Sequence, residues 1–216
     1  MIKGVIFDLD GTTINTLNEL HLSMNETLQE FGLPLKTVDE VRMGIGRRFH
    51  NLILACVPEE AGEEKRGLVE ARFKEVYAKH YLESKPYPGV PELLEELQEL
   101  GVKIAANSNK GDEYTKNIMF SNFPGINFVA VFGARDNVPL KPDPYSANEI
   151  AQLMGLNNDE VVYIGDSEPD MTTGHNAGMK TLACLWGFRD RKTLEEAGAD
   201  AFAESPEEIL EYVKSR

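Results

Sequence analysis

The chain has 216 residues and a formal net charge of −14 at pH 7, with 42% hydrophobic and 27% charged residues. This length accommodates one substantial domain or a core with a small insert, and the composition is that of an ordinary globular protein. The negative charge argues against non-specific binding to nucleic acid or to an anionic membrane. No apolar run approaches the ~20 residues of a membrane span, residues 1–10 lack the pattern of a signal peptide, and the two cysteines lack metal-ligand spacing. We therefore expect a cytoplasmic protein with reduced thiols.

The chain starts with an apolar run, residues 5–7, that predicts a buried strand, and Asp8-Leu9-Asp10-Gly11-Thr12 follows it directly. Two carboxylates one residue apart at a strand end would repel each other and would lose hydration. A divalent cation relieves both costs. The motif therefore indicates an oxygen-ligand metal site of the Mg²⁺ type.

Residues 16–82 show only helical periodicity, which predicts a helical block between the first two strands. One helix is expected from about residue 16 to Phe31, one or two short helices between residues 37 and 57, and another over residues 63–81. The apolar set expected for this last helix is Leu68, Phe73, Val76 and Tyr77. Such an insert is typical of a small α-helical cap domain over residues 16–82, with residues 1–15 and 83–216 forming the core domain.

After Pro86, helices and strands alternate, which predicts a Rossmann-like α/β core with a parallel sheet flanked by helices. The expected helices cover residues 91–100, 112–120, 145–154 and 171–177, and the expected strands cover residues 102–106, 128–132, 161–164 and 181–185. Three of these strands are followed, directly or after a short loop, by polar motifs at residues 107–110, 141–144 and 165–170. In an open parallel sheet, ligands bind outside the carboxyl ends of the strands. We therefore expect these motifs and Asp8–Thr12 to share one crevice.

This four-part pattern resembles the haloacid dehalogenase superfamily of phosphohydrolases, and within it the phosphoglycolate phosphatase and β-phosphoglucomutase group. The matching motifs are Asp8–Thr12, Tyr87–Val90, Ser108–Lys110, Lys141–Pro144, Gly165–Ser167 with Asp170, and Trp186–Phe188. The resemblance covers nearly the whole chain. It implies a Mg²⁺-dependent phosphatase that hydrolyses a small phosphomonoester, phosphoglycolate-like, through an aspartyl-phosphate intermediate.

In this interpretation Asp8 is the nucleophile, because a carboxylate can attack phosphorus without prior deprotonation. The alternative is an Asp8 that only caps or only binds metal. Asp10 is the general acid and base, and in the family the backbone carbonyl at this position also binds the metal. The alternative for Asp10 is a supporting residue that does not contact the substrate.

The remaining predicted site residues belong to the three later motifs. Asp166 is expected to complete the metal site, and Asp170 to ligate through water or to cap the following helix. Ser108 and Asn109 are expected to donate hydrogen bonds to phosphate oxygens. The alternative for Ser108 is to cap a helix, and it could fill both roles together. Lys141 is expected to neutralise Asp8 and the bound phosphoryl group.

The cap sequence is less specific. By position, the loop Gly44-Ile45-Gly46-Arg47-Arg48 resembles the cap loop that reaches the active site in related enzymes, so Arg47 or Arg48 could clamp a substrate carboxylate. Surface positions for both arginines are equally compatible with the sequence. His21 lies one residue away from the position of a functional histidine in the mutase branch, and one residue rotates a helical side chain by about 100°.

Three other functions fit the same motifs: a β-phosphoglucomutase-like phosphotransferase, a pyrophosphatase, and a non-catalytic module that binds phosphorylated ligands. The expected partner is a small phosphorylated metabolite, with no nucleic acid and no membrane, and the expected assembly is a monomer or a weak homodimer.

Overall fold

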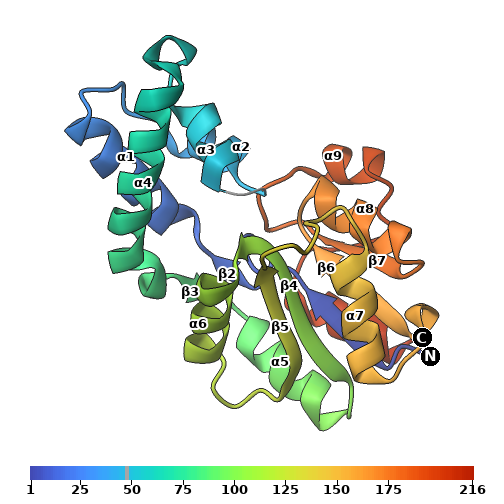
Figure 1. Cartoon of the computed structure of the whole chain (residues 1–216). Helices are drawn as coiled ribbons and strands as arrows, with labels where there is room; N and C mark the ends of the chain where they lie inside the picture. Colours follow the sequence, from blue (N-terminus) through green and yellow to red (C-terminus); the bar gives the residue numbers. More distant parts are fainter. Residues whose placement is uncertain (47–48) are drawn as a thin grey trace.

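The computed structural model describes residues 1–46 and 49–216 of the chain (Figure 1). Its main element is a six-stranded sheet in the order β5-β4-β1-β6-β7-β8, and all neighbouring strands are parallel. The strands are β1 (Gly4–Phe7), β4 (Lys103–Gly111), β5 (Phe128–Ala134), β6 (Val161–Gly165), β7 (Lys180–Cys184) and β8 (Ala201–Ala203). The chain adds strands on one side of β1 and then crosses to the other side, so β1 lies where the strand order reverses. Such a reversal creates a crevice at the carboxyl ends of the strands.

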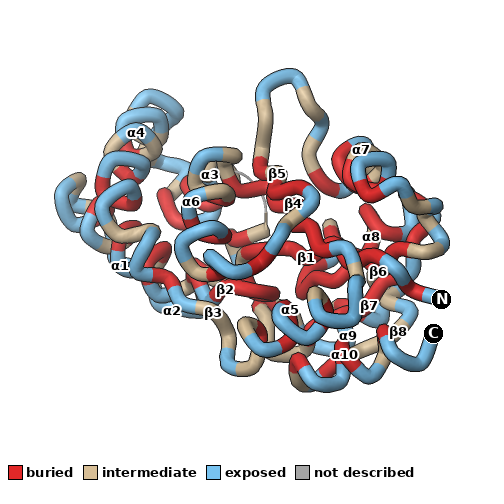
Figure 2. Tube along the Cα trace, turned by 90° about the horizontal axis from the view of Figure 1, so that it is seen from below, coloured by how far each residue is buried: buried red, intermediate tan, exposed pale blue. Residues whose placement is uncertain are grey.

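Alternating side chains of β1 point to two separate hydrophobic clusters, as a pleated strand requires. Val5 and Phe7 pack in a cluster with α5 (Val90–Glu99), α6 (Asp112–Asn122) and α10 (Pro206–Lys214). Ile6 packs on the other face with α7 (Tyr145–Met154). A smaller hydrophobic cluster joins β7 to α8 (Glu168–Asn176) and α9 (Arg191–Glu196). The central strands are therefore buried on both faces, as the red segments of Figure 2 show.

The helical block between residues 15 and 85 gathers most of its buried apolar residues in one hydrophobic cluster, which Phe188 of the core also joins. It contains α1 (Leu17–Glu30), α2 (Val38–Gly44), α3 (Phe49–Cys56), α4 (Gly62–His80) and the short 3₁₀ helices η1 (Glu59–Ala61) and η2 (Tyr81–Glu83). Its two connections to the sheet pair with each other as the antiparallel strands β2 (Ile14–Asn15) and β3 (Lys85–Pro86). In Figure 1 the block extends away from the sheet beyond these two strands.

The structure corrects two details of the helical and strand predictions. Leu68 is 56% exposed and does not belong to the apolar face of α4, whereas its neighbour Val69 is fully buried. The second predicted strand does not end at residue 106 but continues as β4 to Gly111, with a shift of register against β5 after Asn107. The polar motif that follows residue 106 is therefore part of a buried, irregular strand end. A last 3₁₀ helix, η3 (Asn158–Glu160), precedes β6.

None of the helices in the described residues combines the length and the apolar composition that crossing a bilayer requires.

Candidate active site

Asp8 follows β1 directly, and its backbone N–H donates to Ile164 O of β6 at 2.8 Å. The side chain is almost completely buried, at 7% exposure. The Lys141 ammonium lies 2.8 Å from Asp8 Oδ1, but not in the direction of a hydrogen bond, and no other described group donates to this oxygen. Burial and the nearby Asp170 raise the pKa of Asp8 well above its usual value, although Lys141 opposes this. Asp8 thus has an oxygen that is buried, charge-compensated and free of a donor.

Asp166 and Asp170 lie beside Asp8, and ligand oxygens of all three carboxylates come within 4.8 Å of one another. Both oxygens of Asp166 accept hydrogen bonds, one from Thr12 Oγ1 at 3.0 Å and the other from the backbone N–H of Phe188 at 2.7 Å. Burial, with the charge of Asp170, raises the pKa of Asp166 to about 7. Three buried carboxylates in such proximity are unfavourable without a cation.

The backbone of Gly11 and of Gly187 passes so close to Asp166 that neither position has room for a side chain. A Cβ at Gly11 would lie 2.3 Å from Asp166 Oδ2, and a Cβ at Gly187 would lie 2.2 Å from Asp166 Cβ. Gly11 also has a φ of +89°, a conformation that favours glycine. The resulting donor set consists of carboxylate oxygens, one of which has no donor. This set fits a hard divalent cation such as Mg²⁺.

Asp170 belongs to the capping box of α8 and also binds Lys141. Its Oδ1 accepts from Lys141 Nζ at 2.7 Å, while its Oδ2 accepts from the backbone N–H of Ser167 at 3.0 Å and forms the capping box of α8. Burial lowers the pKa of Lys141, but Asp170 and Asp8 outweigh this effect and hold the pKa well above its usual value. Asp170 therefore caps a helix, one of its two predicted roles, and also fixes Lys141. The pairing of Asp170 with Lys141 is not apparent from the sequence.

Asn109 and Ser108 are both buried, and both make contacts within the protein. Asn109 Oδ1 accepts from the backbone N–H of Lys141 at 2.9 Å, and its Nδ2 donates to the carbonyl of Lys141 at 3.2 Å. Ser108 Oγ accepts from the backbone N–H of Lys110 at 3.2 Å. It does not cap α6, because Gly111 occupies the position before that helix. Asn109 thus orients the segment that carries Lys141.

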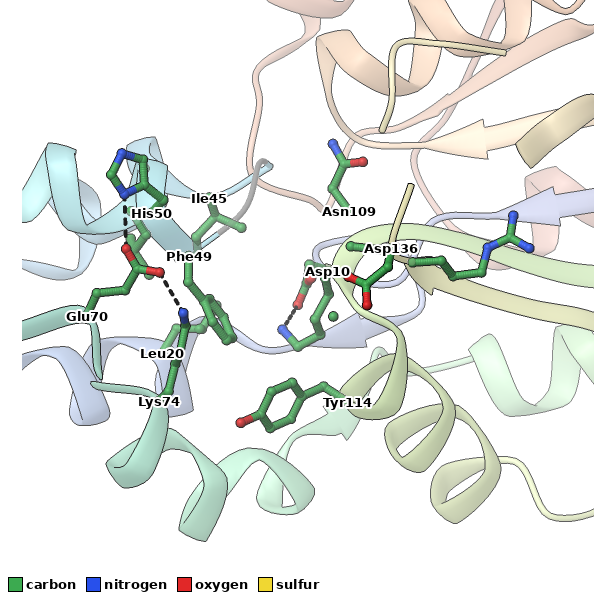
Figure 3. Close-up of a pocket in the computed structure, with 16 residues that line it drawn as sticks. Asp10, Leu20, Ile45, Phe49, His50, Glu70, Lys74, Asn109, Tyr114 and Asp136 are labelled. Atoms are coloured by element: carbon green, nitrogen blue, oxygen red, sulfur yellow. Dashed lines mark hydrogen bonds and ion pairs between the residues drawn. The ribbon is translucent and has the colours of Figure 1, made fainter. Parts of the chain in front are cut away.

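Asp10 is held by two donors to one oxygen. Thr16 Oγ1 donates to Asp10 Oδ1 at 2.6 Å, and Lys110 Nζ lies 2.7 Å from the same atom. Figure 3 shows this ion pair with Phe49 of the helical block and Tyr114 of α6 facing it. Lys110 lies in the motif Ser108–Lys110, but no local pattern indicates that it pairs with Asp10.

Two cavities meet at this edge of the sheet. One, of about 430 Å³, is lined by Asp10 and Lys110 together with Phe49 and Tyr114. The other, of about 700 Å³, is lined by Lys141 and other residues of the strand ends and of the helical block. Asn109 and residues 44–45 line both, so the loop after α2 lies between the two cavities.

Two predicted cap features have different outcomes. Arg47 and Arg48 lie outside the described residues, so the prediction that Arg47 contacts substrate stays a prediction. His21 Nε2 lies 2.9 Å from the carbonyl of Lys36 and 2.9 Å from Asn25 Nδ2, within the helical block.

An open parallel sheet with buried carboxylates and a buried lysine at its carboxyl edge defines an α/β enzyme with a carboxylate-rich active site. The model of the haloacid dehalogenase-like hydrolases matches residues 5–184. A phosphoglycolate phosphatase of Aquifex aeolicus is 33% identical over 193 residues, which cover 87% of this chain and 86% of that protein. One from Vibrio parahaemolyticus is 28% identical over 98% of this chain and 96% of that protein.

A crystal structure from Lactobacillus delbrueckii subsp. bulgaricus superposes with a TM-score of 0.90 at 29% identity and covers 98% of both chains. The chain belongs to the haloacid dehalogenase-like hydrolases, in their phosphoglycolate phosphatase-like group. It is an enzyme of the phosphoric monoester hydrolase class.

Proposed function

We propose that this chain hydrolyses a small phosphomonoester of the phosphoglycolate type in a Mg²⁺-dependent reaction with Asp8 as nucleophile. The observation that carries this proposal is the buried Asp8 carboxylate, whose Oδ1 has the Lys141 ammonium at 2.8 Å but no hydrogen-bond donor among the described residues. Lys141 balances the charge of the Asp8 carboxylate without forming a hydrogen bond to it, so the carboxylate keeps its lone pairs for attack on phosphorus. The substrate class follows from the relatives, which are named as phosphoglycolate phosphatases.

The proposed reaction has two steps. In the first, an oxygen of Asp8 forms a bond to phosphorus, the bond between phosphorus and the leaving oxygen breaks, and Asp10 gives its proton to that oxygen. In the second, a water molecule attacks the phosphorus of the aspartyl phosphate and transfers a proton to Asp10. Inorganic phosphate leaves, and the Asp8 carboxylate is restored.

The metal ligands proposed are Asp8, Asp166 and the backbone carbonyl of Asp10, with Asp170 beside them as the partner of Lys141. Mg²⁺ bound there would favour the ionised carboxylates and would screen the charge of the incoming phosphate. Lys141 contributes a second, permanent positive charge next to Asp8. Ser108 and Asn109 remain proposed phosphate ligands through groups that rearrange from their present contacts.

Residues 16–82 are proposed to act as the cap domain of a core formed by residues 1–15 and 83–216. The support is the hydrophobic cluster that gathers the buried apolar residues of the helical block, with Phe188 of the core at its edge, and the attachment of the block through the paired strands β2 and β3. A cap over the strand ends would exclude bulk water and would restrict the substrate to small molecules. A cytoplasmic monomer or weak homodimer is the proposed setting, and the free thiols of Cys56 and Cys184 are compatible with it.

The proposal is tested by phosphate release with Mg²⁺ across phosphoglycolate, sugar phosphates, pyrophosphate and nucleoside monophosphates, with a chelator control. We expect chelator-sensitive release with one strong preference. Asp8→Asn should abolish it while the folded state persists, as judged by circular dichroism. Substantial activity in this variant would rule out Asp8 as the nucleophile. Release from no compound, together with interconversion of sugar phosphate isomers, would instead identify a mutase.

A further inference from the structure

Lys110 is a buried cation whose contacts come from both sides of the candidate site. Its side chain is 2% exposed, and its ammonium lies 2.7 Å from Asp10 Oδ1. The same ammonium lies 5.1 Å from the ring centroid of Tyr77 and 5.9 Å from that of Phe49. Burying a lysine is costly unless a partner compensates its charge. The charge is compensated here by Asp10, and the aromatic rings add an attraction for the cation.

The second feature is the asymmetry of the Asp10 carboxylate. Thr16 and Lys110 both donate to Oδ1, at 2.6 and 2.7 Å. Oδ2 receives no donor from the described residues, and the side chain as a whole remains 12% exposed. Two donors on one oxygen fix the rotation of the carboxyl group. Such a group presents its other oxygen in one direction, which is what proton delivery to a bound substrate requires.

The third feature is that the two aromatic rings near the Lys110 ammonium belong to the helical block and not to the core. Phe49 and Tyr77 belong to α3 and α4 of the helical block, and they pack against Tyr114 of α6 at ring-centroid distances of 5.8 and 5.6 Å. Asp10 and Lys110, in contrast, follow β1 and end β4. The environment of the ammonium is therefore completed only when the helical block lies over the strand ends.

We propose that Lys110 is a positioning residue, which orients Asp10 for proton transfer to the leaving group when the helical block covers the site. This inference rests on the proposed function, because it requires Asp10 to be the general acid. Lys110 itself does not exchange a proton in either step. It acts through Asp10, and Thr16 supports the same carboxyl oxygen.

The test compares two substrates that differ in their need for an acid. An alkyl phosphate such as phosphoglycolate needs a proton on its leaving oxygen, whereas p-nitrophenyl phosphate releases a stable phenolate. The parameter is kcat/KM in Mg²⁺, since it reports the steps up to phosphoryl transfer and is insensitive to hydrolysis of the aspartyl phosphate. General acid catalysis contributes roughly 10²–10⁴-fold.

We expect Lys110→Met to lower kcat/KM for the alkyl phosphate by about 10²-fold and for p-nitrophenyl phosphate by less than about 10-fold. Lys110→Arg, which keeps the charge, should recover part of the loss. The matched control is Lys116→Met in α6, whose ammonium pairs with Asp112 at the surface, and both substrates should be unaffected. Thr16→Val removes the other donor to Asp10 Oδ1 and should reproduce the selective loss. It keeps the inference testable if Lys110→Met does not fold.

Equal losses on both substrates in Lys110→Met and Thr16→Val would overturn the inference, because they would indicate a general structural defect. A rise of KM with unchanged kcat would also overturn it, and would make Lys110 a direct anchor for the substrate anion. A wild-type protein inactive on both substrates would instead overturn the proposed function itself. The two failures are thus distinguishable.

Discussion

The protonation of Asp166 makes metal binding at this site depend on pH. Burial and the charge of Asp170 raise its pKa to about 7 in the metal-free protein, so a proton competes with a cation for this carboxyl group. Below pH 7 the Asp166 carboxyl group is mainly protonated. Above pH 7 it is mainly ionised, which is the form that binds a metal. The pKa of Asp8 is raised as well, which acts in the same direction.

We therefore expect the apparent affinity for Mg²⁺ to rise between pH 6 and pH 8 and to level off above that range. Isothermal titration calorimetry at a series of pH values measures this directly, and binding should release protons to the buffer. Asp166→Asn should weaken binding at all pH values and should flatten the profile. An affinity that is independent of pH would contradict the proposed ligand set.

Gly11 offers a second prediction, because it combines a steric and a conformational requirement. A Cβ there would lie 2.3 Å from Asp166 Oδ2, in a residue whose φ is +89°. Gly11→Ala should therefore displace Asp166 and remove Mg²⁺ binding. Gly101 has a similar φ of +76° but open space around its Cβ position. Gly101→Ala should thus cost about 1–2 kcal/mol of stability and leave Mg²⁺ binding intact. Equal effects on metal binding would refute the steric argument.

The strands and helices of the core could be predicted from the sequence where apolar periodicity dominates. Tyr145–Met154 agrees to the residue, and the strand predicted over residues 161–164 is β6. The predicted end of this strand at residue 106 was wrong, because the strand β4 continues through the polar but buried residues 107–110. The partners of Asn107, Asn109 and Lys110 come from distant segments, such as Tyr163 Oη for Asn107 Nδ2 at 3.0 Å. Local patterns carry no information on such long-range pairing.

In the candidate site, too, the positions of the motifs could be predicted but some of the contacts between them could not. The four strand-end motifs could be placed at one edge of the sheet because parallel strands share that edge. The predicted contact of Lys141 with Asp8 is present, at 2.8 Å. The additional pairing of Lys141 with Asp170 and the pairing of Lys110 with Asp10 could not be predicted, since both join separate motifs. The prediction that Leu68 belongs to the apolar face of α4 was wrong because adjacent positions on a helix differ by about 100°. Val69 is therefore buried while Leu68 is exposed.

The loop after α2 is held against the sheet by the side chain of Arg189. Its guanidinium donates to the carbonyl of Ile45 at 3.0 Å and also pairs with Glu168 at 3.1 Å. Asn109 Nδ2 donates to the carbonyl of Gly46 at 3.2 Å. These contacts join the helical block to the strand ends through backbone groups, so they depend on the position of the loop and little on its side chains.

Arg189→Met should therefore loosen the loop, and amide hydrogen exchange at residues 42–46 should become faster. Mg²⁺ binding should stay unchanged, because Arg189 contacts none of the proposed metal ligands. The matched control is Lys192→Met in α9, whose side chain is 82% exposed. Unchanged exchange in Arg189→Met would show that other contacts hold the loop.

For the molecule as a whole, charge is the dominant constraint on substrate binding. The net charge of −14 opposes any anionic ligand. Within the site, the four carboxylates of Asp8, Asp10, Asp166 and Asp170, when ionised, form ion pairs among the described residues with the ammonium groups of Lys110 and Lys141 alone. The excess of two negative charges equals the charge of one Mg²⁺ ion, so the cation would bring the site to neutrality before a phosphate arrives.

It follows that binding of an anion should depend on prior binding of the cation. Inorganic phosphate should raise the midpoint of thermal unfolding in the presence of Mg²⁺ and should have no effect in its absence, because only a ligand that binds the folded state stabilises it. Differential scanning fluorimetry at constant ionic strength measures both conditions, and sodium chloride in place of phosphate controls for screening of the net charge. Stabilisation by phosphate without Mg²⁺ would mean that Lys110 and Lys141 alone attract the anion. The charge balance between the carboxylates and the cation would then not govern the order of binding.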